Sequence, residues 1–234
     1  MTEQWWQRAV RDSLVVLLTL TTGAVDAACF LRLGNVFASV ITGNMVLLGV
    51  SAATQSATLA ISSGVALAGY CAGVLIGAPI ATRRGSEGET WPPSVTVTLV
   101  AEFCVLAGFS VGWELTGGSP GSLARLLLSA ALAAAMGIQS TAVRQLGGMS
   151  STYLTGTLTG VLVDLVARDR PPGFARSVGV LGAILFGAAV GGLVADNAPA
   201  WLPAVILVPL AAVVIASVAG FEPVKAQLSP RRDR

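Results

Sequence analysis

The stretch TGAVDAACFLRLGNVFASVITGNMVLLG, residues 22–49, decides how the rest of the chain is interpreted. An apolar, helix-like run carries Asp26 near its middle and breaks at residues 32–35, Arg-Leu-Gly-Asn. A shorter apolar piece follows and contains Thr42, Gly43 and Asn44. A long apolar run, a break and a piece too short to cross a bilayer predict a membrane helix followed by a re-entrant or broken one.

The same layout occurs again later in the chain. At an offset of 113 positions (147 − 34) and without a gap, the matches are Gly34 with Gly147, Thr42-Gly43 with Thr155-Gly156, and Asp26 with Gln139. Chance is a poor explanation for a break, a polar mid-helix residue and a Thr-Gly pair in one register. We interpret the pattern as an internal duplication, with repeats at 13–115 and 122–220 of a single integral membrane domain, residues 1–234.

Composition points to the membrane. Of the 234 residues 54% are hydrophobic and 11% are charged, and the mean hydropathy is +0.77, whereas soluble domains carry about 25% charged residues. The net charge of +2 is too small to suggest nucleic acid. The three cysteines lie in apolar runs, which argues against a disulfide framework. The chain has no histidine, and we expect no metal site, no cofactor, no catalytic group and no enzymatic activity.

Six runs are long enough to span a bilayer of about 30 Å. They cover residues 13–33, 57–81, 94–115, 122–146, 174–195 and 200–220. The short pieces at 36–50 and 149–167 do not reach that length. Small residues recur every four positions in two spans, as Gly69, Gly73 and Gly77 and as Gly187 and Gly191. Such faces let another helix approach closely, either within the chain or in a homo-oligomer.

The positions of Lys and Arg predict the orientation. If neither short piece crosses, both termini, the loop with Arg83 and Arg84, the turn at 144–148 and the loop at 168–176 all face the cytoplasm. The loops at 51–56, 116–121 and 196–200 then face outward without Lys or Arg, which leaves Arg32 at that side. Three crossings per repeat insert the halves in opposite orientations, so the predicted fold is an all-α membrane protein made of two inverted three-helix repeats.

Several of these residues resemble a known family. Gly23-Ala24-Val25-Asp26-Ala27, Gly34, Phe37, Thr42-Gly43-Asn44, Gly137-Ile138-Gln139 and Thr155-Gly156-Thr157 are similar to the pattern of the YoaK-like bacterial membrane proteins, known as domain of unknown function 1275. The resemblance covers nearly the whole chain. It implies about six membrane helices and a bacterial cytoplasmic (inner) membrane location, and it implies no substrate or mechanism.

Two acidic residues inside the spans are candidates for proton coupling, because an ionisable group within a membrane helix is by default a functional hypothesis. Asp26 either takes up a proton or cation, or is a buried carboxyl that holds the backbone of the broken helix. Glu102 is either a second proton carrier or the partner of Arg144. Gln139 completes a solute site opposite Asp26, or makes an ordinary interhelical hydrogen bond.

The two Thr-Gly pieces are candidates for solute binding, since glycine lets the backbone leave helical geometry and the neighbouring hydroxyl and amide groups cap a half-helix or face a solute. Close helix packing is the alternative. The predicted substrate-binding set is Asp26, Thr42, Gly43, Asn44, Gln139, Thr155, Gly156 and Thr157. The predicted function is a secondary, proton-coupled transporter of a small polar solute. A passive channel, a carrier that exports hydrophobic drugs and a non-transporting sensor or assembly module remain alternatives.

Overall fold

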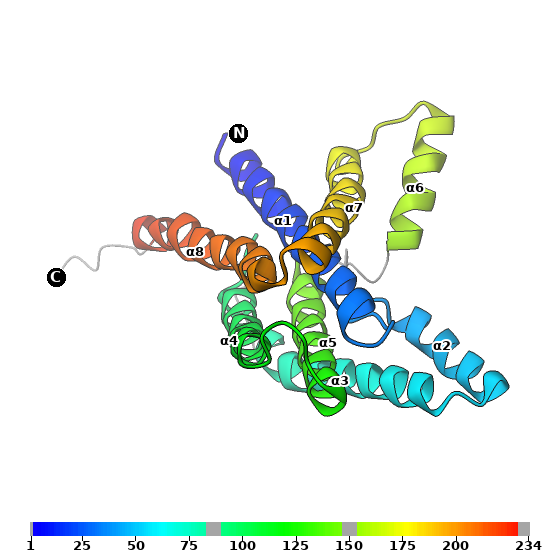
Figure 1. The fold of residues 1–234 in the computed structure, drawn as a ribbon. Helices are drawn as coiled ribbons and strands as arrows, with labels where there is room; N and C mark the ends of the chain where they lie inside the picture. The colour runs from blue at the N-terminus through cyan, green and yellow to red at the C-terminus, as the bar shows by residue number, and fades with distance from the viewer. Residues whose placement is uncertain (1, 83–89, 147–153, 229–234) are drawn as a thin grey trace.

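The computed structural model describes residues 2–82, 90–146 and 154–228 (Figure 1). The predicted landmarks Arg83, Arg84 and Gly147 lie outside these residues. Within them the chain forms eight α-helices and one 3-10 turn, with no strand. The elements are α1 (Thr2–Arg32), α2 (Ile41–Thr54), α3 (Ala57–Ala81), α4 (Pro93–Leu115), α5 (Ser122–Gln145), α6 (Leu154–Ala167), α7 (Phe174–Asn197), η2 (Pro199–Trp201) and α8 (Leu202–Leu228).

Six of these helices are long and apolar enough to cross a membrane, and they are the six predicted spans. The prediction of an all-α membrane protein with six spans is therefore confirmed. The other two, α2 and α6, have 14 residues each. At 1.5 Å per residue such a helix is about 21 Å long, which is short of the roughly 30 Å hydrocarbon core.

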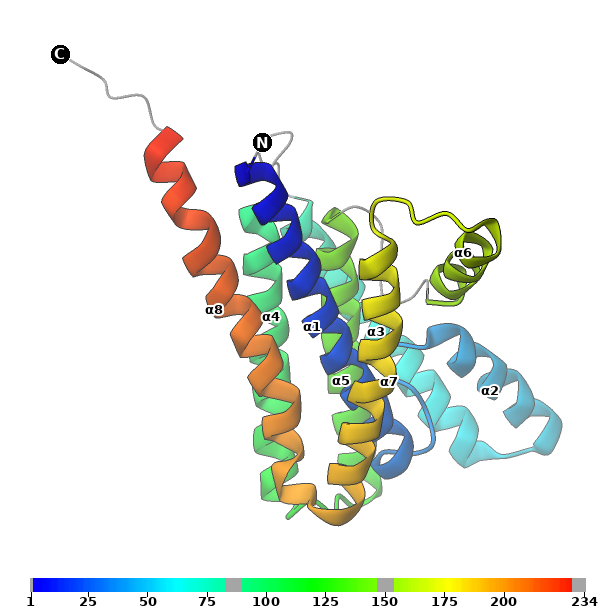
Figure 2. The ribbon, with the colours of Figure 1, turned by 90° about the horizontal axis from the view of Figure 1, so that it is seen from above.

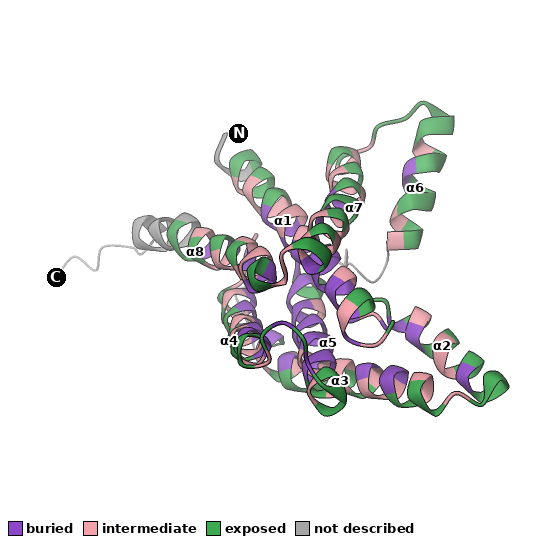
Figure 3. Ribbon diagram, viewed as in Figure 1, coloured by how far each residue is buried: buried purple, intermediate pink, exposed green. Residues whose placement is uncertain are grey.

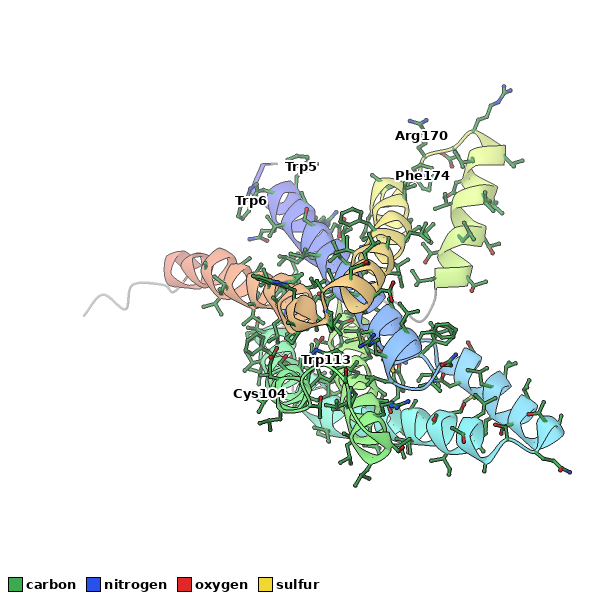
Figure 4. All side chains as sticks on the ribbon, viewed as in Figure 1. Trp5, Trp6, Cys104, Trp113, Arg170 and Phe174 are labelled. Atoms are coloured by element: carbon green, nitrogen blue, oxygen red, sulfur yellow. The ribbon has the colours of Figure 1, made fainter. Side chains whose placement is uncertain are left out.

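The largest difference in helix boundaries concerns the start of the chain. The polar residues before position 13 are part of α1, which is 31 residues long. They hold the ion pair of Asp12 with Arg11 and with Arg176 of α7. Trp5 and Trp6 on this first part of α1 are exposed (Figure 4), as expected for aromatic rings at the membrane–water interface.

The most extensive helix contacts are those of α1 with α7 and of α3 with α5. Small residues allow both, because a Cβ added to Gly73 would collide with Ala134 of α5 and one added to Gly187 would collide with Leu20 of α1. The prediction of close helix approach at these faces is confirmed. Within the described residues, other helices of the same chain lie against these faces.

Both contacts also use a glycine of the opposing helix. Gly23 of α1 lies against the backbone of Ile184 and Ala188, and Gly137 of α5 lies against that of Tyr70 and Val74. The offset is 114 in every case (137 − 23, 184 − 70, 188 − 74). At this offset the counterpart of Asp26 is Ser140, whereas the ungapped match at 113 paired Asp26 with Gln139. The sequence register was therefore one residue off in this helix.

The chain turns at two opposite ends of the bundle (Figure 2). One end carries the start of α1, the start of α4, the start of α7 and the C-terminal end of α8, and the other carries η2 and the loop at 116–121. At this second end Arg32 donates to the carbonyl of Gly118 and Arg125 to that of Pro120. Both bonds tie a cation to the same loop.

Helices α2 and α6 project from the bundle and lie apart from each other in both views (Figures 1 and 2). Helix α2 packs on α3 and α6 on α7. Only Val161 of α6 is buried, and the rest of that helix is largely exposed (Figure 3). At its C-terminal side the guanidinium of Arg170 lies 6.0 Å from the ring centroid of Phe174 (Figure 4).

The core lies where α1, α4, α5 and α8 meet. Its largest wholly buried side chains include Phe109 and Trp113, whose rings stack with centroids 5.9 Å apart. The indole Nε1 of Trp113 donates to the carbonyl of Pro199 at 2.8 Å and so ties α4 to η2. Cys29 of α1 is buried as well, whereas Cys71 and Cys104 are exposed on the outside of their helices.

Candidate functional site

The break between α1 and α2 forms because two consecutive residues leave helical geometry. Gly34 has φ 125° and Asn35 has φ 59°, a region that glycine adopts without cost and asparagine tolerates. The amide of Leu33 bonds the carbonyl of Cys29, and that of Asn35 bonds Phe30, which closes the end of α1. The next five residues return the chain toward the side of α1.

Asp26 holds this returning segment. One carboxyl oxygen accepts hydrogen bonds from the amides of Ala38 and Ser39, both at 2.8 Å, and the other accepts from the hydroxyl of Ser39. The side chain is 6% exposed. Amide donors in this segment would otherwise lie unsatisfied at membrane depth, where each costs several kcal/mol. The structure therefore matches the alternative in which Asp26 holds the backbone of the broken helix.

Asn44 fixes the same segment from the other side. Its Oδ1 accepts from the amide of Phe37 at 2.9 Å, and its Nδ2 donates to the carbonyl of that residue. The ring of Phe37 stacks on Phe30 with centroids 5.2 Å apart, and Gly43 lies against that ring. Thr42 is exposed. The polar atoms of Asp26 and Asn44 that were predicted to bind solute are thus occupied by backbone groups of the break and by the hydroxyl of Ser39.

A second buried polar group connects three helices from both halves of the chain. Nε2 of Gln139 on α5 donates to Oε1 of Glu102 on α4 at 2.9 Å. The hydroxyl of Thr22 on α1 lies 2.8 Å from Oε1 of Gln139 and 3.1 Å from the carbonyl oxygen of Leu18. We call Thr22, Gln139 and Glu102 the core polar chain. Glu102 and Thr22 are both 0% exposed.

Glu102 has an incomplete set of partners. Its second carboxyl oxygen, Oε2, is buried without a hydrogen-bond partner. Arg144, the sequence-based alternative partner, is exposed, and the described residues contain no ion pair to Glu102. A buried carboxyl with one donor and no cation is costly to keep charged. An unsatisfied buried group of this kind calls for a functional explanation.

The predicted solute site is not assembled as one group. Asp26, Gly43 and Asn44 lie at the α1–α2 break, and Gln139 lies in the core polar chain. Thr155 and Gly156 are exposed on α6, and Thr157 is partly exposed there. Helix α6 packs on α7, away from α2 (Figure 1). Within the described ranges no three acidic or cysteine side chains gather as a metal site would require.

Sequence reasoning missed Thr22 and Ser39. Thr22 opens the decisive stretch and lies four residues before Asp26, but a threonine in a membrane span usually bonds its own helix backbone, as it also does here. Ser39 lies in the break, two residues before the start of α2, where a hydroxyl suggests a helix cap. No feature of the sequence indicated that its partner is Asp26, thirteen residues earlier.

The comparisons with known proteins agree with the membrane architecture. The model of a family described as "Protein of unknown function (DUF1275)" matches residues 14–216. The "UPF0700 transmembrane protein YoaK" of Bacillus subtilis (strain 168) is 38% identical over 162 residues, which are 68% of this chain and 69% of that protein. No solved structure matches the chain.

Proposed function

The chain belongs to the YoaK-like DUF1275 family of multi-pass membrane proteins, and from this premise we propose that it is a secondary transporter of a small polar solute. The transporter is proton-coupled, and Glu102 is the group that takes up and releases the proton. The bacterial inner membrane is its location. Gln139 and Glu102 remain from the predicted site, and Asp26 becomes a structural residue.

The observation that carries the proposal is the unpaired Oε2 of Glu102 in the middle of the bundle. An acidic residue inside a membrane domain is expensive, so it is retained where it serves a pathway or a partner. Asp26 has its full set of donors, whereas Glu102 has one. A carboxyl with a free oxygen can bind a proton or the polar group of a solute without first breaking a bond of the fold.

The helix packing supports two inverted repeats. The first helix of each half packs on the second long helix of the other half, as α1 on α7 and α5 on α3, at a constant offset of 114. Helices α1 and α5 run in opposite directions along the bundle (Figure 2). Opposite directions of the two first helices are expected of inverted-topology transporters, in which the site lies near the midplane between the repeats. The core polar chain joins both halves at such a place.

The charges support cytoplasmic termini. Arg8, Arg11, Arg144 and Arg176 lie toward the end of the bundle that holds the start of α1. The opposite end holds Arg32 and Arg125, each tied to a loop carbonyl. The excess of cations at the first end is typical of the cytoplasmic side.

The test uses purified protein in liposomes that contain a pH-sensitive dye, with amino acids, nucleosides, polyols and small organic cations added one at a time. We expect one class to cause proton movement that saturates with concentration. Glu102→Gln is expected to abolish that movement while the variant still exchanges labelled solute across the membrane. Unchanged proton movement in Glu102→Gln would refute the coupling role.

The alternatives give other results in the same assay. A passive channel gives flux that follows the gradient and does not saturate. A non-transporting sensor or assembly module gives no solute-dependent flux for any class, although the protein is folded. Either result overturns the proposal of a carrier.

A further inference from the structure

We propose that the core polar chain reverses its hydrogen bonds when Glu102 gains or loses a proton, and that Gln139 and Thr22 are positioning residues that transmit this change to α1. The inference rests on the proposed coupling role of Glu102 and adds how the proton is sensed. It follows from the distances between the polar atoms of the core polar chain, which suit two alternative sets of hydrogen bonds.

The first set belongs to the carboxylate form. Nε2 of Gln139 donates to Oε1 of Glu102 over 2.9 Å, and the hydroxyl of Thr22 donates to Oε1 of Gln139 over 2.8 Å. Every donor in this set points toward the negative charge. The orientation of the Gln139 amide group thereby links the charge of Glu102 to the direction of the hydrogen bond made by Thr22, which lies on a different helix.

The second set belongs to the protonated form. The free Oε2 of Glu102 takes up the proton and becomes a donor. Rotation of the carboxyl group about the Cγ–Cδ bond of Glu102 turns this O–H toward Gln139, where it can no longer face the amide N–H. A half-turn about the Cγ–Cδ bond of Gln139 brings its oxygen to Glu102 and its Nε2 to Thr22. The hydroxyl of Thr22 then accepts that N–H and gives its own proton to the carbonyl of Leu18, already 3.1 Å away. One O–H bond forms on Glu102, and no other covalent bond changes.

No other charged group competes for Glu102 among the described residues. On α5, Arg125 bonds the carbonyl of Pro120, and Arg144 is exposed. On α1, Asp26 bonds Ser39, and Arg32 bonds the carbonyl of Gly118. Asp12, also on α1, pairs with Arg11 and Arg176. On α3, Tyr70 bonds Ser140 and Cys71 is exposed. The part of α8 at 202–219 has no titratable side chain, and Cys104 and Glu114 of α4 are exposed. Among the described residues, Gln139 is therefore the group that hydrogen-bonds Glu102.

The reversal changes the bonding of α1. In the carboxylate form the Thr22 hydroxyl donates to Gln139 of α5, and in the protonated form it accepts from Gln139 and donates to Leu18 of its own helix. Helix α1 packs on α7 and α8 of the other half. A change in the bond between α1 and α5 is thus a change at the contact between the two halves, where an inverted-repeat transporter moves.

The experiment is pH-difference infrared spectroscopy of the purified protein in lipid nanodiscs. The protein is produced in cells supplied with isotope-labelled glutamine. The Glu102 carboxyl band is the one lost in Glu102→Gln, and the Gln139 amide band is the one lost in Gln139→Leu. We expect both to change at the same pH. In Thr22→Val the amide C=O band should move to higher wavenumber at high pH, where its oxygen faced Thr22. At low pH, where that oxygen faces Glu102, the band should stay at its wild-type position.

The matched control is Thr22→Ser, which keeps the hydroxyl and should behave as wild type at both pH values. A merely structural role predicts that Thr22→Val moves the amide band equally at both, and this result would overturn the inference. The inference would also be overturned if the amide band stayed unchanged when Glu102 becomes protonated. A Glu102 band that does not change with pH in folded protein would overturn it too. Because the measurement needs no solute, reversal without any transport would reject the proposed function alone. Coupled transport without reversal would reject this inference alone.

Discussion

Asp26 and Glu102 are both acidic, both buried and both inside membrane helices, yet their surroundings differ. The oxygens of Asp26 accept three hydrogen bonds from two residues of the α1–α2 break. Those of Glu102 accept one, from Gln139, and one oxygen has no partner. Burial of an acidic side chain therefore does not by itself indicate function. The number of bonds that the fold already makes to it separates a structural carboxyl from an available one.

The largest expected effect is that of Asp26→Leu. The change leaves two amides and one hydroxyl without an acceptor, and each buried orphan costs about 1–3 kcal/mol. We expect a loss of about 3–6 kcal/mol, or roughly 10–20 °C in melting temperature, measured by thermal unfolding in detergent. Asp26→Asn, which keeps one acceptor oxygen, should fall between. A wild-type melting temperature for Asp26→Leu would contradict the assignment of Asp26 as the residue that holds the α1–α2 break.

Asn44→Leu should have the next largest effect. It removes both bonds to the backbone of Phe37 while it keeps a side chain of similar size. The expected loss is about 2–3 kcal/mol, with the exposed neighbouring change Met45→Ala as the control. If Asn44→Leu were as stable as its control, the break would be held by Asp26 alone.

Glu102→Gln should be nearly neutral for folding. The variant keeps the oxygen that accepts from Gln139 and removes an acidic group that has no ion pair, so the stability should change by less than about 1 kcal/mol. The same variant should lose proton-coupled uptake. Unfolding of Glu102→Gln under conditions where Asp26→Asn survives would reverse the assignment of the two acids.

The smallest effect is expected for Thr155→Val on α6. The side chain is exposed on a helix outside the bundle, and surface changes are usually within about 0.5 kcal/mol. Solute uptake should match that of wild type. A loss of uptake with unchanged stability would indicate that the second Thr-Gly piece contributes to the solute site, and that Glu102 is not the main residue of that site.

The fold was predictable to the extent that it depends on local hydropathy and on small residues. The six spans, the break after Arg32 and the close approach at Gly73 and Gly187 all follow from runs of neighbouring residues. The shortness of α2 and α6 was visible too. The position of α6 on the outside of the bundle was not predictable, because its apolar sequence is compatible with contact to lipid as well as to protein.

The site was less predictable because it depends on how each helix is rotated. One residue is 100° of rotation in a helix with 3.6 residues per turn. The shift from an offset of 113 to 114 therefore separates Gln139, which faces Glu102, from Ser140, which bonds Tyr70. The sequence identified Asp26, Gln139 and Glu102 as the polar residues of interest but could not tell which of them touch.

Glu102 has a carboxyl oxygen that is free to react, whereas both oxygens of Asp26 are hydrogen-bonded. Dicyclohexylcarbodiimide, which reacts with protonated carboxyl groups in apolar surroundings, tests this difference directly when the labelled protein is digested and analysed by mass spectrometry. We predict an adduct on Glu102 that is absent from Glu102→Gln and present in Asp26→Asn, with Asp26 unlabelled in the wild type. Label on Asp26, or no label on Glu102 in protein that is folded in lipid, would contradict the account.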